Sequence, residues 1–223
     1  MHASQTAAHE LRHHFADMDQ QRDTASFGMW IFLVTEIMFF GGLFLSYMLY
    51  RFLYPTAFLE GSRHMNIRLG ALNTAVLICS SLTMVLAVRC VKINQRKLTV
   101  IFLLITMLLG FAFMGVKAIE YHEHWVAREV PGPAFQFEGT DPRHTQIFFS
   151  LYFAMTGLHA LHMIIGCGLV LFLMINAWRG AYNSEYYNPV EIGGLYWHFV
   201  DIVWIWLFPL LYLISHQHVG GGF

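Results

Sequence analysis

The hydrophobic residues of this chain fall into five long, continuous runs rather than alternating with polar residues. A helix needs roughly 20 apolar residues to cross about 30 Å of hydrocarbon. Continuous runs favour helices over the strands of a membrane barrel, in which apolar and polar residues alternate. The pattern therefore predicts an all-α protein, a polytopic membrane bundle of five transmembrane helices. The expected spans are about 27–50, 69–89, 98–119, 147–178 and 195–214.

Polar segments flank and separate these runs. Residues 1–26 form a polar N-terminal tail without the apolar core of a signal peptide, so we expect the first span to be a retained helix. Residues 27–215 form the membrane domain, and residues 216–223 form a short C-terminal tail. Between the third and fourth spans, Pro131-Gly132-Pro133 interrupts any helix and predicts a loop.

The composition supports a membrane protein. Charged residues make up 12% of the chain and hydrophobic residues 57%, whereas soluble domains carry about 25% charged residues. The net charge of −1 gives no indication of a nucleic-acid partner. Cys79, Cys90 and Cys167 lie in or beside apolar runs and are interpreted as small buried hydrophobic residues.

The distribution of Lys and Arg gives a weak prediction of orientation, because cytoplasmic loops are enriched in these residues. The two sides carry nearly equal numbers when Lys117 is counted on the outer side. The dense group in the short loop 89–97 (Arg89, Lys92, Arg96 and Lys97) favours a cytoplasmic N-terminus.

Five ionisable residues lie inside the predicted spans. They are Glu36 in the first span, His159 and His162 in the fourth, and His198 and Asp201 in the fifth. Each of the two pairs has i,i+3 spacing, so its members share a helix face, and all five lie at similar depth. Ionisable residues in a bilayer usually face the protein interior. We therefore expect one buried polar cluster in which imidazoles donate hydrogen bonds to Glu36 and Asp201.

Such a cluster has three interpretations. The favoured one is structural, since each interhelical hydrogen bond contributes about 0.6–2 kcal/mol. The second is a proton-linked site, because a desolvated Glu36 tends to be protonated. The third is a metal or haem site, which is disfavoured because His159 and His162 are too close on one helix to serve two haems.

A second group of possible metal ligands occurs at Glu120-Tyr-His-Glu-His124, where the third span ends. We interpret it as a solvated interfacial segment, so no metal site is expected. Ser46, Ser80 and Ser81 lie in spans without a matching base, and no catalytic residue is expected in this chain.

Several of these residues lie in motifs that resemble subunit III of haem–copper oxygen reductases, the cytochrome c oxidase subunit III family. The resemblance covers about residues 27–215. It is carried by the segments 28–42, 72–74, 119–121, 156–166 and 196–204, the last reading Tyr-Trp-His-Phe-Val-Asp-Ile-Val-Trp.

The resemblance implies a subunit without haem or copper of its own. In the family, subunit III packs against subunit I, which holds the haems and copper, and subunit II completes a core that reduces oxygen and pumps protons. Subunit III stabilises subunit I, supports proton uptake and binds phospholipid, and a larger respiratory supercomplex is a further possible assembly. Glu36 corresponds to the family's carbodiimide-reactive carboxylate, and Glu120, Tyr121 and Trp197 are secondary candidates. The implied location is the bacterial cytoplasmic (inner) membrane.

One departure from the family pattern concerns the number of spans. The mitochondrial-type subunit has seven, and this chain lacks the first two, so it resembles the short five-helix bacterial form. The missing helices form one wall of the family's lipid cleft. Cytochrome c oxidase is the favoured complex. The alternatives are a quinol oxidase, a five-span accessory protein of nitric oxide reductase, and an autonomous membrane protein that binds haem or a metal.

Overall fold

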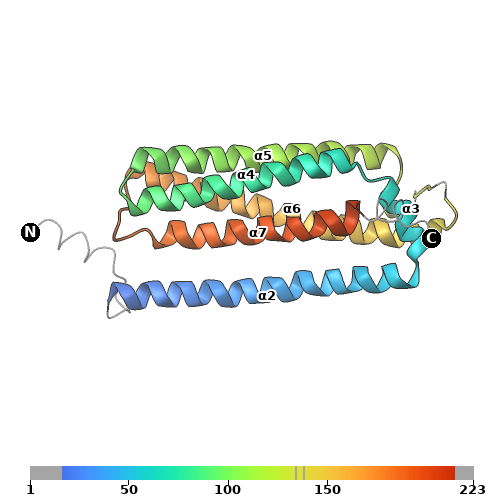
Figure 1. The fold of residues 1–223 in the computed structure, drawn as a ribbon, viewed down its shortest axis with the longest axis horizontal. Helices are drawn as coiled ribbons and strands as arrows, with labels where there is room; N and C mark the ends of the chain where they lie inside the picture. Colours follow the sequence, from blue (N-terminus) through green and yellow to red (C-terminus); the bar gives the residue numbers. More distant parts are fainter. Residues whose placement is uncertain (1–16, 134, 138, 214–223) are drawn as a thin grey trace, which may run out of the picture.

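The computed structural model describes residues 17–133, 135–137 and 139–213, and this part of the chain is helical without strands. The helices are α2 (Met18–Leu53), α3 (Pro55–Arg63), α4 (Ile67–Lys92), α5 (Arg96–Val126), α6 (Pro142–Arg179) and α7 (Asn188–Tyr212). All except the short α3 are long and apolar enough to cross a membrane. The prediction of an all-α, five-span bundle is thus confirmed (Figure 1). The predicted C-terminal tail, 216–223, lies outside the described residues.

The helices extend beyond the apolar runs that predicted them. α2 begins at Met18, inside the expected polar tail, because the Asp17 side chain accepts a hydrogen bond from the backbone N–H of Gln20 at 2.7 Å and so caps the helix. α5 continues to Val126 rather than ending near residue 119. Polar residues can continue a helix into water, so hydropathy marks the membrane-embedded part but not the helix ends.

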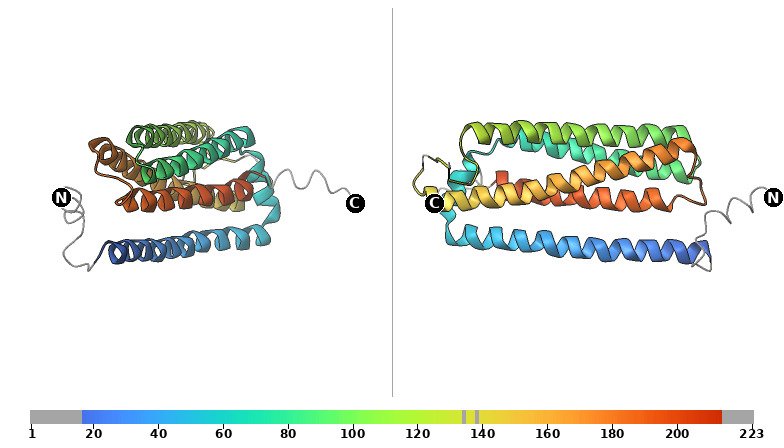
Figure 2. Two further views of the ribbon diagram at one scale, coloured as in Figure 1. Left: turned by 60° about the vertical axis from the view of Figure 1, so that its left-hand side comes forward. Right: turned by 180° about the vertical axis from the view of Figure 1, so that it is seen from behind.

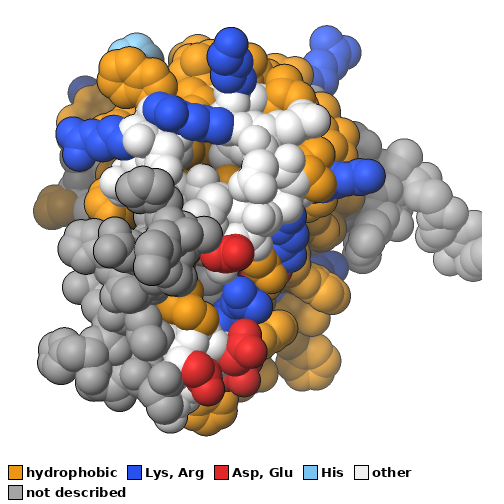
Figure 3. Space-filling view, turned by 90° about the vertical axis from the view of Figure 1, so that its left-hand side faces the viewer, with side chains coloured by type: hydrophobic (Ala, Val, Ile, Leu, Met, Phe, Trp, Pro, Cys, Tyr) orange, Lys and Arg blue, Asp and Glu red, His pale blue; other side chains and the backbone are white. Residues whose placement is uncertain are grey.

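α4, α5, α6 and α7 form a packed bundle, and α2 lies beside it along α7 and α6 (Figures 1 and 2). The short α3 lies at one end, which we call the α3 end, together with the loop between α5 and α6. The opposite end is the basic end. Figure 3 shows Lys and Arg side chains gathered on it, and the last turns of α4 and α6 supply Arg89, Lys92 and Arg179.

Trp197 on α7 is fully packed at the centre of this bundle, where it is 1% exposed. Its indole ring packs against a glycine on each of two facing helices, where no side chain occupies the space. A Cβ atom on Gly110 of α5 would lie 2.9 Å from the ring, and one on Gly166 of α6 would lie 3.2 Å from it. The indole N–H donates to the Ser80 hydroxyl of α4 at 3.0 Å. Trp197 therefore fixes α7 against the three other helices of the bundle.

The cysteines only partly follow the prediction. Cys90 and Cys167 are buried, but Cys79 is exposed on the outer surface of α4. An apolar run does not reveal which face of a membrane helix points outward, because both faces are hydrophobic.

Candidate functional site

Glu36 and His162 form an interhelical pair between α2 and α6. His162 Nε2 lies 3.1 Å from Glu36 Oε2, and the two side chains are 12% and 19% exposed. The other ring nitrogen, Nδ1, lies 2.8 Å from the Leu158 carbonyl oxygen. A carbonyl can only accept, so Nδ1 carries a proton. Nε2 and Glu36 consequently share one proton, either as carboxylic acid and neutral imidazole or as carboxylate and imidazolium.

His198 and Asp201 lie on the side of α7 that faces α4, separate from this pair. His198 Nδ1 is 2.7 Å from the Ser81 hydroxyl of α4. Asp201 is 3% exposed and interacts with Ser81, but neither of its carboxyl oxygens makes a hydrogen bond of ordinary length among the described residues. The expected hydrogen bond from an imidazole to Asp201 is absent from this part of the chain.

His159 occupies a third position, inside the bundle. It is 1% exposed, and neither ring nitrogen has a hydrogen-bond partner among the described residues. Its ring packs against Phe113 at 5.4 Å and Trp204 at 5.3 Å between centroids. These aromatic rings surround the imidazole closely, as in a packed core. The five predicted residues therefore occupy three places instead of one cluster.

The most extensive buried polar group was not predicted. Lys117 of α5 donates to Glu120 Oε2 (2.9 Å), to the Tyr152 hydroxyl of α6 (3.1 Å) and to the Tyr212 hydroxyl of α7 (3.0 Å). Both tyrosines donate in turn to Glu120 Oε1, at 3.0 and 2.5 Å. All donors of the ammonium group are thereby used, and each carboxylate oxygen accepts at least one hydrogen bond. We call these four residues the closed network.

The closed network corrects two interpretations of the sequence. Lys117 was counted as a charge on the outer side, but it is 4% exposed inside the bundle. Glu120 and His124 were interpreted as solvated, but they are 1% and 5% exposed. The i,i+3 spacing of Lys117 and Glu120 was the available signal, because it places an ion pair on one helix face. The tyrosines that complete the network come from distant segments and carry no such signal.

A second polar group continues toward the surface at the α3 end. Glu129 lies 2.6 Å from His64 Nδ1 and 2.6 Å from His124 Nδ1. Burial raises the pKa of Glu129, but the hydrogen bond and charge of His124, followed by those of His64, outweigh burial and leave the pKa below its ordinary value. Together with Glu120 and Glu123, these residues line a cavity of about 210 Å³.

The secondary candidates have clear structural partners. The Tyr121 hydroxyl lies 2.6 Å from that of Thr156, which links α5 to α6. Trp197 bonds Ser80, as described above, and Glu120 belongs to the closed network. Among residues 17–213 apart from 134 and 138, no three His, Cys, Asp or Glu side chains are placed to hold a metal ion.

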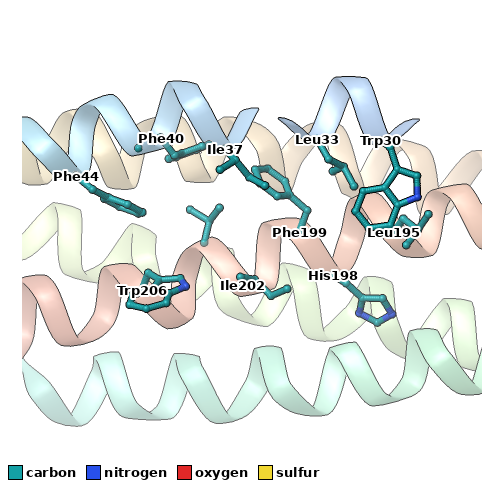
Figure 4. Close-up of a pocket in the computed structure, with 12 residues that line it drawn as sticks. Trp30, Leu33, Ile37, Phe40, Phe44, Leu195, His198, Phe199, Ile202 and Trp206 are labelled. Carbon is teal, nitrogen blue, oxygen red and sulfur yellow. The ribbon is translucent and has the colours of Figure 1, made fainter. Parts of the chain in front are cut away.

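An apolar groove separates α2 from α7 (Figure 4). Its volume is about 570 Å³, and aromatic residues such as Trp30, Phe44 and Trp206 line it. Figure 4 shows His198 on the side of α7 away from α2. The groove is therefore almost entirely hydrophobic, and it has the character of a site for an acyl chain rather than for a polar substrate.

Comparison with known proteins decides the family. The family model described as "Cytochrome c oxidase subunit III" matches residues 7–216. The chain belongs to the cytochrome c oxidase subunit III family. It is 33% identical to cytochrome c oxidase subunit 3 of Synechocystis sp. over 86% of this chain and 76% of the relative. It is 31% identical to that of Thermostichus vulcanus over 84% and 86% of the two chains.

The family also includes subunits of quinol oxidases. Cytochrome bo(3) ubiquinol oxidase subunit 3 of Pseudomonas aeruginosa is 31% identical to this chain, and the match covers 93% of each protein. The chain is thus subunit III of a haem–copper oxidase, an oxidoreductase complex.

Proposed function

We propose that this subunit III is a non-catalytic structural component of a bacterial cytochrome c oxidase in the inner membrane. It packs against subunit I, which carries the haems and copper, beside subunit II. The observation that carries the proposal is the family match across residues 7–216, which includes every described membrane helix. The closed network supports a structural role, because it ties three helices into one rigid body.

The orientation we propose has the N-terminus in the cytoplasm. Arg89, Lys92 and Arg179 lie in the last turns of α4 and α6 at the basic end, and α2 begins at the same end (Figure 1). Burial of Lys117 removes one positive charge from the opposite surface, so the charge asymmetry is larger than the sequence count gave.

Glu36 and His162 are the residues we assign to proton uptake. Because they share one proton and remain partly exposed at the α2–α6 surface, they can exchange that proton without leaving an unpaired charge in the membrane. A hydrophobic carbodiimide should modify Glu36, and Glu36→Gln should abolish the modification while the complex stays assembled. Modification of the Glu36→Gln variant at an unchanged level would contradict the assignment.

Phospholipid binding is proposed for the groove between α2 and α7. Aromatic and aliphatic walls around about 570 Å³ suit an acyl chain. Lipid analysis of the purified complex should show a bound phospholipid. The substitution Phe44→Trp narrows the groove and should displace that phospholipid. Full retention of lipid in that variant would argue against this site.

Co-purification from native membranes tests the function directly. A tagged chain should bring down partners that carry haem and copper and should give an oxidase spectrum after reduction. A tagged chain purified without such partners would contradict the proposal.

A quinol oxidase is the second candidate. The match to the Pseudomonas aeruginosa relative, which covers 93% of both proteins, favours it. The purified complex should oxidise reduced cytochrome c under our main proposal. Oxidation of quinol alone would assign the chain to the second candidate.

A further inference from the structure

A second groove, of about 470 Å³, lies between α4 and α7 on the outer face of the bundle. We call it the α4–α7 groove. Its walls are aliphatic, with Leu82 of α4 and Ile205 of α7 at 59% and 46% exposure. His198 lines both grooves, but Ser81 and Asp201 line only the α4–α7 groove of these two.

Asp201 is the feature that distinguishes this groove. Ser81 of α4 interacts with Asp201, and the same hydroxyl lies 2.7 Å from His198 Nδ1, so one Ser hydroxyl, with a single proton to donate, serves both side chains. Neither Asp201 oxygen makes a hydrogen bond of ordinary length among the described residues, although the residue is only 3% exposed. An unpaired carboxyl group in an apolar setting costs free energy that a hydrogen-bond donor in the groove would remove.

Pro209 adds a second acceptor one turn farther along α7. It lies inside the helix and has no backbone N–H, so the Ile205 carbonyl cannot receive its usual helical hydrogen bond. Ile205 itself lines the groove. The Ile205 carbonyl is therefore a second acceptor without its usual helical donor, one turn from Asp201 on α7.

The chemistry of the groove selects its occupant. Acyl chains have no donor and cannot satisfy these oxygens. A transmembrane helix can lie in an apolar groove without exposing its backbone, and a Ser, Thr, Asn, Gln, Trp or Arg side chain can donate from it. At the basic end a further pocket of about 340 Å³ lies beside the groove, shares Val85 and His198 with it and reaches the Lys92–Glu191 ion pair (2.7 Å).

We propose that the α4–α7 groove is the docking surface for a transmembrane helix of a partner oxidase subunit, and that this helix donates a hydrogen bond to Asp201. The proposal rests on the proposed function, since it requires that the chain assembles with other oxidase subunits. Beyond that function, the proposal identifies the face of this chain that contacts the partner and the kind of side chain that the partner helix supplies.

Photo-crosslinking in native membranes tests the surface. The crosslinking amino acid p-benzoylphenylalanine replaces Leu82 or Ile205 in the groove. As matched controls it replaces Phe111 of α5 or Phe172 of α6, which are 54% and 60% exposed on other faces. Groove positions should form an adduct with one other membrane subunit of the oxidase, and control positions should label lipid.

The outcomes separate this inference from the proposed function. Lipid adducts alone at both groove positions, or an adduct between two copies of this chain, would overturn the docking surface while the chain still co-purifies with the oxidase. A chain that purifies without any oxidase subunit would instead overturn the proposed function.

Substitution of Asp201 tests the hydrogen bond. Asp201→Leu should lower the amount of this chain retained in the purified complex about three- to twentyfold, in line with the loss of one interhelical hydrogen bond. Asp201→Asn keeps an acceptor, so most of this chain should be retained in the purified complex. Asn73→Leu is the control, because Asn73 is also buried and unpaired but does not line the groove. Equal retention of the Asp201→Leu and Asn73→Leu variants would refute a donor from the partner.

Discussion

Two buried polar regions of this subunit differ in how their hydrogen bonds are completed. The closed network of Lys117, Glu120, Tyr152 and Tyr212 is satisfied within the chain. Asp201 is almost equally buried, but its carboxyl oxygens make no hydrogen bond of ordinary length in the described residues. The same residue chemistry can therefore either hold a bundle together or leave an acceptor available at its surface. The following predictions test that distinction.

The largest expected effect is that of Lys117→Met. Removing the ammonium group strands a buried Glu120 carboxylate, which should cost about 3–5 kcal/mol of unfolding free energy. The measurement is denaturant unfolding of the purified subunit in detergent. The control is the double variant Lys117→Met with Glu120→Met, which removes both charges and should lose less stability than the single variant. A double variant that loses the sum of both single effects would show that the pair is not coupled.

A smaller loss of unfolding free energy is expected for Trp197→Phe. Trp197 links α7 to α4 one turn before Asp201. The substitution removes the bond to Ser80 and part of the ring that fits against Gly110 and Gly166, so about 1–3 kcal/mol should be lost. Thermal unfolding in detergent measures this, with Trp206→Phe on the exposed face of α7 as the control. Equal effects of the two substitutions would contradict the central position of Trp197.

The His64–Glu129–His124 group at the α3 end should be sensitive to acid. The pKa of Glu129 is lowered in the folded chain, so its stabilising contribution is present above its ordinary pKa and is lost as pH falls through the folded value. The effect is up to about 1 kcal/mol, because the His64 side chain that pairs with Glu129 is 46% exposed and solvent screens that interaction. The protection of the amides after α5 against hydrogen exchange, measured relative to the intrinsic exchange rate at each pH, should therefore fall below about pH 4.5.

Glu129→Gln provides the control for this pH dependence. Its loop should exchange faster at neutral pH and should show little further change on acidification. A variant with the same acid transition as the unmodified chain would assign the transition to another group, such as Asp141, whose pKa is also lowered, mainly by its hydrogen bond with His144.

The smallest effect should come from Glu36→Gln. An amide can still bond His162, and interhelical hydrogen bonds of this kind contribute about 0.6 kcal/mol on average. Assembly and most of the oxygen reduction should persist, as measured by oxygen uptake of the purified complex. Complete loss of turnover in an assembled complex would indicate a direct catalytic role for Glu36.

The membrane fold was predictable because the length and continuity of apolar runs determine it. The presence of five apolar helices follows from the sequence, whereas the start of α2 at Met18 depends on local capping by Asp17 that hydropathy does not report. The family could also be predicted from the sequence, because the spacing of His198 and Asp201 and the tryptophans that flank them are specific to that family.

The candidate site was less predictable. Depth and i,i+3 spacing suggested one cluster, but they contain no information on the rotation of one helix relative to another. His162 consequently faces α2 whereas Asp201 faces α4. The closed network was missed because a Lys near a span end resembles a loop charge until its partners on α6 and α7 are known.

The most direct test of the contrast between the two regions is to measure Asp201→Leu in two settings. In the isolated subunit, removal of an unpaired buried carboxyl group should raise the unfolding free energy or leave it unchanged. In the assembled oxidase, the same substitution should release the subunit more readily during detergent purification. Destabilisation of the isolated subunit together with unchanged retention in the complex would contradict the account, because it would place the partner of Asp201 within this chain.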